Sequence, residues 1–242
     1  MISLHSKVAI VTGASRGIGR AIALQLAEKG ARVVLAARNR RDLDTVARKA
    51  RWSGAEVLVV PCDVGVERQV EALVKKTLAK FGRIDILINN AGIGIKKPVA
   101  EFATRDWDRI MDTNLKGVFL LTREVLPMMK RQKGGQIINI GSLAGKNPVV
   151  NHAPYCASKF GLIGFSESVG LEVRNLGIKV SLLLPGSVDT HFGRRKPSGT
   201  KVKRAENALT ADEVAEACLF LASQDALAWS SQLNIRPLIL NR

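Results

Sequence analysis

The chain has 242 residues, of which 46% are hydrophobic, and this length and composition suit one sizeable core in a single domain. No apolar run approaches the roughly 18 residues of a membrane-spanning helix, and the first seven residues are too few and too polar for a signal peptide. Three widely spaced cysteines and three separated histidines argue against a disulfide framework and a metal cluster. We therefore expect a cytoplasmic protein with reduced thiols, no bound metal and no membrane segment.

The net charge of +16 favours anionic partners such as phosphates, acidic carrier proteins or nucleic acid. Scattered solubilising charge is an equally simple interpretation. The basic residues form no recognisable nucleic-acid-binding motif, so we expect no nucleic acid.

Apolar runs and helical periodicity alternate along the chain. Runs that predict strands occupy 8–12, 33–36, 57–60, 84–88, 137–140, 180–184 and 233–240. Helical patterns occupy about 18–27, 43–50, 70–81, 107–121 and 155–176, with a last helix opened by a Thr210–Glu213 capping box. This alternation predicts a single Rossmann-type domain over 1–242, α/β in class, with a doubly wound parallel sheet of about seven strands and helices on both faces.

Two segments near the end depart from this pattern. Residues 191–206 have little apolar periodicity and contain six basic residues against one acidic residue, which predicts a short basic lid at about 190–208. Pro237 predicts an edge position or an end for the seventh strand, because proline has no N–H to donate to a ladder.

Three glycines (Gly13, Gly17 and Gly19) follow the first apolar run and open the first helix. Glycine lets a backbone approach a pyrophosphate, and a helix N-terminus offers free N–H groups and a positive dipole end. A tight turn would also need glycine, but the position between strand and helix favours nucleotide binding.

The second strand ends at Arg38, where an acidic residue usually accepts hydrogen bonds from the ribose of NAD. Arg38, together with Arg16, would instead bind a 2′-phosphate, so we predict NADP(H) as the cofactor. The simpler interpretation is a solvated basic start to a helix, although cations are disfavoured at that end.

Tyr155 and Lys159 lie four residues apart in the 155–176 helix and so share one face of it. An unperturbed phenol is a poor acid or base near neutral pH, and a neighbouring ammonium would lower its pKa. We expect this pair to carry the proton-transfer chemistry. Cys156, between them, is interpreted as a packing residue, and His152 as either a pocket or a surface residue.

With these motifs in this order, the sequence resembles the short-chain dehydrogenase/reductase family from about residue 7 to 190, and in particular its 3-oxoacyl-acyl-carrier-protein reductases. The resemblance implies four catalytic residues, namely Asn114, Ser142, Tyr155 and Lys159. It implies a cofactor site of Gly13, Ser15, Arg16, Gly17, Ile18, Gly19, Arg38, Asp63, Val64, Asn90, Ala91, Gly92, Tyr155, Lys159, Pro185, Gly186, Val188 and Thr190.

The family roles each have a physical reason. Asp63 would bind the adenine amino group, although alone it would be a helix cap. Ser142 would polarise the substrate carbonyl. Asn114 would hold a water that resupplies protons to Lys159 from a local helix kink, or would simply be a surface residue.

The resemblance implies NADPH-dependent reduction of a ketone or a 3-oxoacyl thioester by a homo-oligomer, either a tetramer or a dimer. The basic residues Lys130, Arg131, Lys133 and Arg174, with the lid, would fit an acidic carrier protein that delivers the thioester. Alternatives are an alcohol or sugar dehydrogenase that works oxidatively, and a cofactor-sensing or nucleic-acid-binding protein on the same scaffold. A sensor would not need all four catalytic residues.

Overall fold

The computed structural model describes residues 1–190 and 207–238. The predicted lid therefore lies almost wholly outside the described residues, as do the last four residues of the chain.

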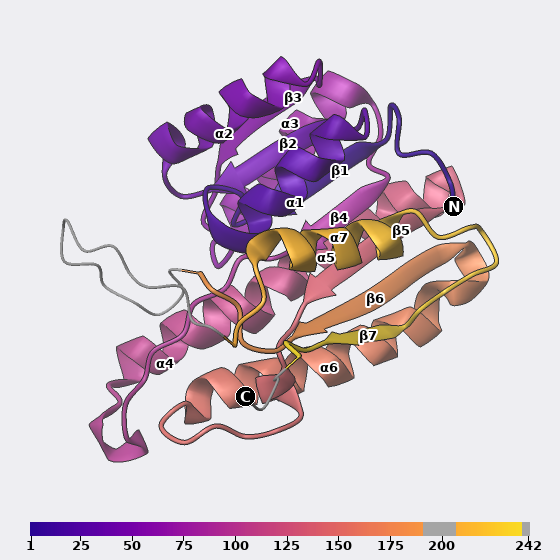
Figure 1. The fold of residues 1–242 in the computed structure, drawn as a ribbon. Helices are drawn as coiled ribbons and strands as arrows, with labels where there is room; N and C mark the ends of the chain where they lie inside the picture. Colours follow the sequence, from indigo (N-terminus) through magenta and orange to yellow (C-terminus); the bar gives the residue numbers. More distant parts are fainter. Residues whose placement is uncertain (191–206, 239–242) are drawn as a thin grey trace.

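Seven strands in the described residues form one parallel sheet (Figure 1). They are β1 (Val8–Thr12), β2 (Arg32–Ala37), β3 (Val57–Pro61), β4 (Ile86–Asn89), β5 (Gly135–Ile140), β6 (Ile178–Pro185) and β7 (Gln232–Ile235). Their order across the sheet is β3-β2-β1-β4-β5-β6-β7, and every neighbouring pair is parallel. This topology confirms the predicted doubly wound, Rossmann-type fold.

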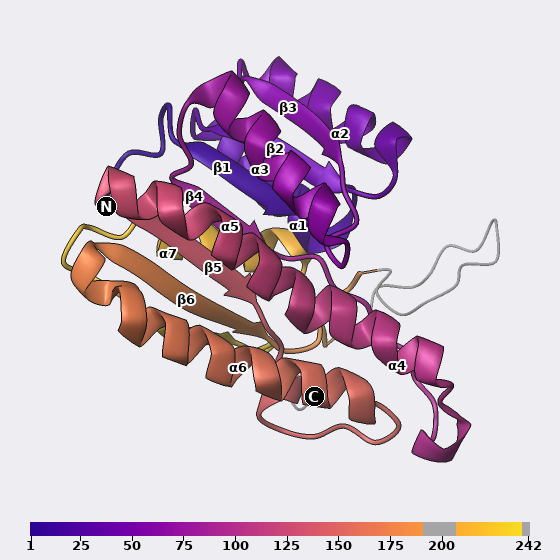
Figure 2. The same ribbon diagram turned by 180° about the vertical axis from the view of Figure 1, so that it is seen from behind.

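Helices cover both faces of the sheet. The main helices are α1 (Gly17–Glu28), α2 (Arg40–Trp52), α3 (Glu67–Phe81), α4 (Thr104–Met111), α5 (Gly117–Gln132), α6 (Ala153–Val173) and α7 (Ala211–Ala222). Helices α1, α2 and α7 pack on one face, and α3, α5 and α6 on the other (Figures 1 and 2). No helix of the described residues is long and apolar enough to cross a membrane.

The continuous apolar runs are explained by burial on both faces. All five residues of β1 are buried, with alternate side chains in the two separate cores. A strand between two helical layers has no solvent-facing side, so it cannot show the polar alternation of a half-exposed strand.

Several helix ends follow from local sequence, as predicted. Helix α3 ends at Gly82 and the α6 region ends at Gly177, both in the left-handed conformation that glycine adopts without strain. Helix α7 begins with the predicted capping box, in which the Thr210 hydroxyl accepts from the Glu213 N–H and the Glu213 carboxylate accepts in return.

Two elements differ from the prediction. The helical region over 107–121 is divided between α4 and α5 by a π-helical turn, η2 (Asp112–Lys116), because the hydrophobic pattern is insensitive to one widened turn. The seventh strand ends at Ile235 instead of continuing towards 240, two residues before Pro237.

The strand order reverses at β1, and this reversal determines where a ligand site can form. Strand β1 has β2 on one side and β4 on the other, so the chain leaves the sheet centre in opposite directions. In such sheets a crevice opens at the carboxyl ends of these strands, where the connecting loops diverge.

Candidate active site

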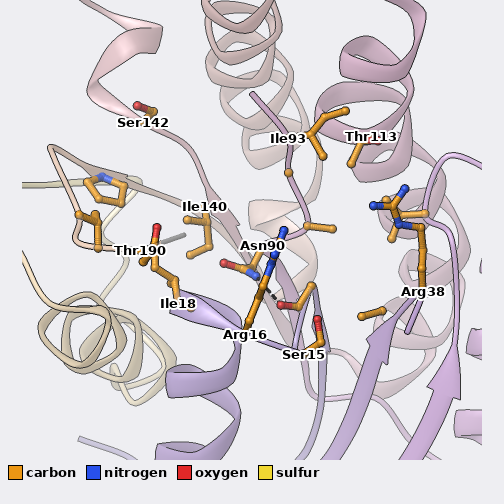
Figure 3. Close-up of a pocket in the computed structure, with 18 of the residues that line it drawn as sticks. Ser15, Arg16, Ile18, Arg38, Asn90, Ile93, Thr113, Ile140, Ser142 and Thr190 are labelled. Atoms are coloured by element: carbon orange, nitrogen blue, oxygen red, sulfur yellow. Dashed lines mark hydrogen bonds between the residues drawn. The ribbon is translucent and has the colours of Figure 1, made fainter. Parts of the chain in front are cut away.

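A cavity of about 470 Å³ occupies this crevice at the carboxyl edge of the sheet (Figure 3). It is lined by loops that follow six different strands, β1 to β6, and by the first turns of α6. Of the residues named from sequence, all line the cavity except two, Gly19 and Asn114. The tertiary fold therefore gathers one group of residues from positions spread over 13–190.

The glycine turn after β1 forms one wall of the cavity. Gly13 has φ +62°, and a Cβ there would come within 2.8 Å of the Asn90 amide nitrogen. A Cβ on Gly19 would collide with the Gly13 carbonyl, which explains why Gly19 lies behind the wall and does not line it. Glycine at these positions therefore lets the turn pack tightly against itself and against Asn90.

Helix α1 begins at this turn with its N-terminal N–H groups uncapped by a side chain. Its N-cap residue, Arg16, makes no capping hydrogen bond, and the first turn has no acidic residue. Ser15, Arg16, Gly17 and Ile18 all face the cavity. An anion at this place would meet both free N–H donors and the positive end of the helix dipole.

Arg38 lies in the same wall at the end of β2 (Figure 3). Its side chain and that of Arg16 are exposed, and neither forms an ion pair with a described residue. Helix α2 starts only at Arg40, with Asn39 as its N-cap, so Arg38 precedes the helix. Asp42, in the first turn of α2, also lines the cavity and is the nearest acidic alternative.

Asp63 is not the N-cap of α3, which is Val66; it lies in the turn that precedes this helix. Its Oδ1 accepts a hydrogen bond from the Gly65 N–H at 3.1 Å, which stabilises the turn after β3, and the residue also lines the cavity beside Val64. Cys62 lines it too, and burial, reinforced by the Asp63 charge, raises its thiol pKa to about 11. Cys62 is thus a neutral packing group, not a nucleophile.

Asn90 braces the glycine turn. Its side-chain amide donates to the Thr12 carbonyl at 2.8 Å and to the Gly13 carbonyl at 3.3 Å, while the Thr12 hydroxyl accepts from the N–H groups of Asn90 and Ala91. These bonds join the loop after β4 to the loop after β1. Asn90, Ala91 and Gly92 line the cavity, but the Asn90 amide donors are directed at the protein backbone.

Asn114 is buried in the π-helical turn η2, which excludes the surface interpretation. Its Oδ1 accepts from the Ile93 N–H at 2.8 Å, and its Nδ2 donates to the Ile93 carbonyl and to the Ser158 hydroxyl. The side chain therefore holds the loop after β4 against α6. Both N–H groups of the amide are used by the protein, so a water in this region would meet only the remaining lone pair of Oδ1.

Ser142 lies at the far end of the cavity from Arg38 (Figure 3). Tyr155, which is hydrogen-bonded to Ser142, and Lys159 line the same cavity. Ser142 follows β5 and its Oγ accepts from the Ala144 N–H at 3.1 Å. The Lys159 Nζ lies 5.8 Å from the centre of the Tyr155 ring and donates to the Ile140 carbonyl at 2.8 Å. A phenol, a hydroxyl and an ammonium thus face one space beside the ends of β5 and β6.

Burial dominates the electrostatics of this trio. It lowers the pKa of Lys159 from 10.5 to about 8. It also raises the pKa of Tyr155, and the hydrogen bond with Ser142 only partly offsets that rise. Among the chain's own groups, burial therefore outweighs the lowering of the phenol pKa that we expect from Lys159, whose Nζ donates to the Ile140 carbonyl.

The remaining predicted residues complete the wall beyond β6. Pro185, Gly186, Val188 and Thr190 line the cavity. Strand β7 supports this loop, since the Gly186 N–H donates to the Ile235 carbonyl at 2.8 Å. Cys156 is buried with its sulfur against the Val149 N–H, as expected for a packing residue.

Sequence reasoning missed several lining residues. They are Ala37, Asn39, Asp42, Cys62, Ile93, Thr113, Ile140 and Gly141. Most are sequence neighbours of residues that were named, so the adjacent motif was the available signal. Thr113 lies in the widened η2 turn beside Asn114, where the resemblance implied a local helix kink.

The basic residues assigned to an acidic partner lie elsewhere. Lys130, Arg131 and Lys133 lie at the end of α5, and Arg174 follows α6. Both helix ends lie at the amino edge of the sheet (Figure 2), whereas the cavity lies at the carboxyl edge. The two ends touch, because a Cβ on Gly177 would be 2.9 Å from the Lys133 carbonyl. We call these four exposed cations the Lys130–Arg174 surface. This surface is remote from the cavity of the same chain.

Comparison with known proteins agrees with this architecture. The family model for short chain dehydrogenases matches residues 7–201. A 3-oxoacyl-[acyl-carrier-protein] reductase from Synechocystis is 42% identical over 78% of the chain and 77% of its own length. A metagenomic short-chain oxidoreductase solved with NADP is 40% identical, with a TM-score of 0.86 over 98% of this chain and all of its own.

An alcohol dehydrogenase from the archaeon Thermococcus sibiricus, solved with 5-hydroxy-NADP, is 30% identical, with a TM-score of 0.90 over 98% of this chain and 99% of its own. Sequence and fold thus agree over nearly the whole chain. The protein belongs to the short-chain dehydrogenase/reductase family of oxidoreductases.

Proposed function

We propose that this enzyme uses NADPH to reduce a carbonyl substrate, a ketone or a 3-oxoacyl thioester, to a secondary alcohol. The main support for this proposal is that groups suited to a cofactor and groups suited to proton transfer line one cavity. Its Arg38 end offers two cations and free N–H groups, and its other end offers Ser142, Tyr155 and Lys159.

The residues present suit a nicotinamide dinucleotide. Gly13 and Gly17 line the cavity at the uncapped start of α1, where a pyrophosphate would bind, and Arg16 and Arg38 would hold a 2′-phosphate by charge-assisted hydrogen bonds. Asp63 and Val64 would lie at the adenine, and Pro185, Gly186, Val188 and Thr190 at the nicotinamide. When bound, the reduced cofactor supplies the hydride.

The chain's own residues would handle the substrate oxygen. The Ser142 hydroxyl would donate to the carbonyl oxygen, which polarises the bond. The Tyr155 hydroxyl would deliver its proton to that oxygen as the hydride reaches the carbon, so the products are an alcohol and the oxidised cofactor. Lys159, charged beside it, would stabilise the phenolate left behind.

Tyr155→Phe tests the catalytic assignment. We expect it to lose at least about a hundredfold in kcat, the typical contribution of a general acid, while NADPH still binds. NADPH oxidation should be measured with simple ketones, diketones and a 3-oxoacyl thioester on coenzyme A. Unchanged turnover in this variant would overturn the assignment.

Arg38→Glu tests the cofactor assignment. The carboxylate would repel a 2′-phosphate but accept from ribose hydroxyls, so kcat/KM should fall for NADPH and rise for NADH. Arg41→Glu is the matched control, since Arg41 is exposed on α2 and does not line the cavity. Equal effects of the two substitutions would indicate general surface charge instead of a specific contact.

An oxidative role is the second candidate. The resemblance in fold to the Thermococcus sibiricus alcohol dehydrogenase favours it, because the same trio can run in reverse with Tyr155 as a base. Comparing kcat/KM for NADP⁺ with alcohols and for NADPH with ketones distinguishes the two directions.

The substrate carrier and the assembly complete the proposal. The Synechocystis relative acts, by its name, on a 3-oxoacyl group attached to an acyl-carrier protein, and the Lys130–Arg174 surface would suit an acidic protein. Exposed Phe119, Phe160 and Leu171 on α5 and α6 would be covered by a second copy of the chain. Light scattering would give the assembly. In an oligomer this surface would serve the cavity of a neighbouring copy, so charge reversal of Lys130 should raise KM only for a carrier-bound substrate.

A further inference from the structure

A chain of buried polar side chains crosses the apolar layer between the sheet and α6. The Asn89 amide, at the end of β4, donates to the Asn139 Oδ1 on β5 at 2.8 Å. The Asn139 amide in turn donates to the Ser166 hydroxyl on α6 at 2.8 Å. All three residues are buried, and Asn139 is fully inaccessible.

The bond that Ser166 makes within α6 fixes the donor-to-acceptor direction of these hydrogen bonds. The Ser166 hydroxyl donates to the Leu162 carbonyl at 2.6 Å, so toward Asn139 it can only accept. Asn139 must then present its amide to Ser166 and its carbonyl oxygen to Asn89. The Asn89 Oδ1 is left as a buried acceptor without a partner among the described residues. An unpaired buried acceptor costs about 1–3 kcal/mol, so this polar chain is not the most stable filling for an apolar layer.

Ser166 and Asn139 each belong to an element that carries a catalytic residue. Ser166 is seven residues, or two helical turns, after Lys159, so both project from the same face of α6. Asn139 immediately precedes Ile140, whose carbonyl accepts the Lys159 ammonium, and it lies three residues before Ser142. The Asn139–Ser166 bond therefore joins the helix that carries Lys159 to the strand that leads to Ser142.

The apolar contacts around this bond are less directional. Leu162, Val169 and Val173 complete the buried face of α6, and such contacts permit small rotations and slides of a helix at little cost. A hydrogen bond with both partners oriented permits one register only.

We propose that Asn139 and Ser166 are positioning residues, which set the rotation of α6 so that the Lys159 ammonium reaches the Ile140 carbonyl and faces Tyr155. The proposal rests on the catalytic roles of Tyr155 and Lys159 given above. Neither residue touches substrate or cofactor, and both act through Lys159.

Ser166→Ala removes the acceptor with little change in volume, and Ser181→Ala is its matched control. Ser181 is also fully buried, on the neighbouring strand β6, and its hydroxyl bonds Gln136, not α6. We expect Ser166→Ala to lower kcat about ten- to a hundredfold, the cost of displacing a catalytic group by a fraction of an ångström to 1 Å, with KM for NADPH within about twofold. Ser181→Ala should leave kcat within about twofold.

The pH profile distinguishes positioning from simple loss of stability. The Lys159 ammonium favours the Tyr155 phenolate, so a displaced ammonium should move the alkaline limb of the kcat profile for reduction to higher pH. Asn139→Leu should reproduce this shift. The double variant should be no slower than the worse single variant, because both substitutions remove the same Asn139–Ser166 hydrogen bond.

Failure of this proposal is separable from failure of the proposed function. Activity in the wild type and its loss in Tyr155→Phe establish the function first. If Ser166→Ala and Ser181→Ala then lose equal stability and both keep the wild-type kcat and pH profile, the polar chain is only structural.

Discussion

The buried ammonium of Lys159 makes the strongest quantitative prediction about this enzyme. Lys159 is only 5% exposed, and burial lowers its pKa from 10.5 to about 8. At 1.36 kcal/mol per pKa unit, holding the charged form inside the folded chain costs about 3 kcal/mol. Replacement by methionine, of similar length and no charge, removes this cost but also the hydrogen bond to Ile140, which contributes about 1 kcal/mol. Lys159→Met should therefore be inactive but about 2 kcal/mol more stable than the wild type at pH 7.

The sign of the pH dependence follows from linkage. Below about pH 8 the lysine is charged in both the folded and the unfolded chain, so the wild type bears the full burial cost. Between about 8 and 10.5 only the unfolded chain binds the proton, and the stability contribution of this group rises with pH. The advantage of Lys159→Met should shrink across that window and vanish above it.

Urea unfolding at fixed protein concentration, followed by tryptophan fluorescence at pH 7, 9 and 10.5, measures this difference. Lys75→Met on α3 is the control, because Lys75 is exposed and the change should stay within about 0.5 kcal/mol. A methionine variant no more stable than the wild type at pH 7, or an advantage unchanged at pH 10.5, would refute the reasoning.

Three further predictions use single groups. Tyr155 is the only tyrosine in the chain, so ultraviolet titration of its phenolate reports its pKa directly; it should titrate above the ordinary value of 10, and higher still in Ser142→Ala, which removes a bond that lowers it. A phenolate that forms below pH 10 in the cofactor-free enzyme would contradict the dominance of burial. Thr122→Val removes a buried hydroxyl with no partner among the described residues, and thermal unfolding should show a stability equal to or up to about 1 kcal/mol above the wild type; a loss above that size would reveal a missed partner. Gly19→Ala should weaken NADPH binding at least tenfold in a fluorescence titration because its Cβ meets the Gly13 carbonyl, whereas Gly134→Ala, with 3.7 Å of clearance to the Gly177 carbonyl, should bind normally.

Much of the candidate site was recognisable because its residues occur at strand ends in a fixed order. The glycine turn, Arg38, Ser142 and Tyr155 each follow or begin a predictable element, and a parallel sheet brings all carboxyl ends of its strands to one edge. Identifying the strands therefore also predicted that residues at their carboxyl ends lie together at one edge of the sheet.

The sequence alone determined the fold class and the order of the strands and most helices, because hydrophobic period and glycine positions are local signals. It also indicated the candidate catalytic pair, because residues four apart share one face of a helix. Tertiary structure decided what depends on distant neighbours. It placed Lys159 against the Ile140 carbonyl and made burial the largest influence on the pKa of Tyr155. It directed the Asn90 amide to the carbonyl groups of the glycine turn. It also placed the Lys130–Arg174 surface at the edge of the sheet opposite the cavity. Burial and hydrogen-bond direction are properties of the assembled layers, so no pattern within one element could reveal them.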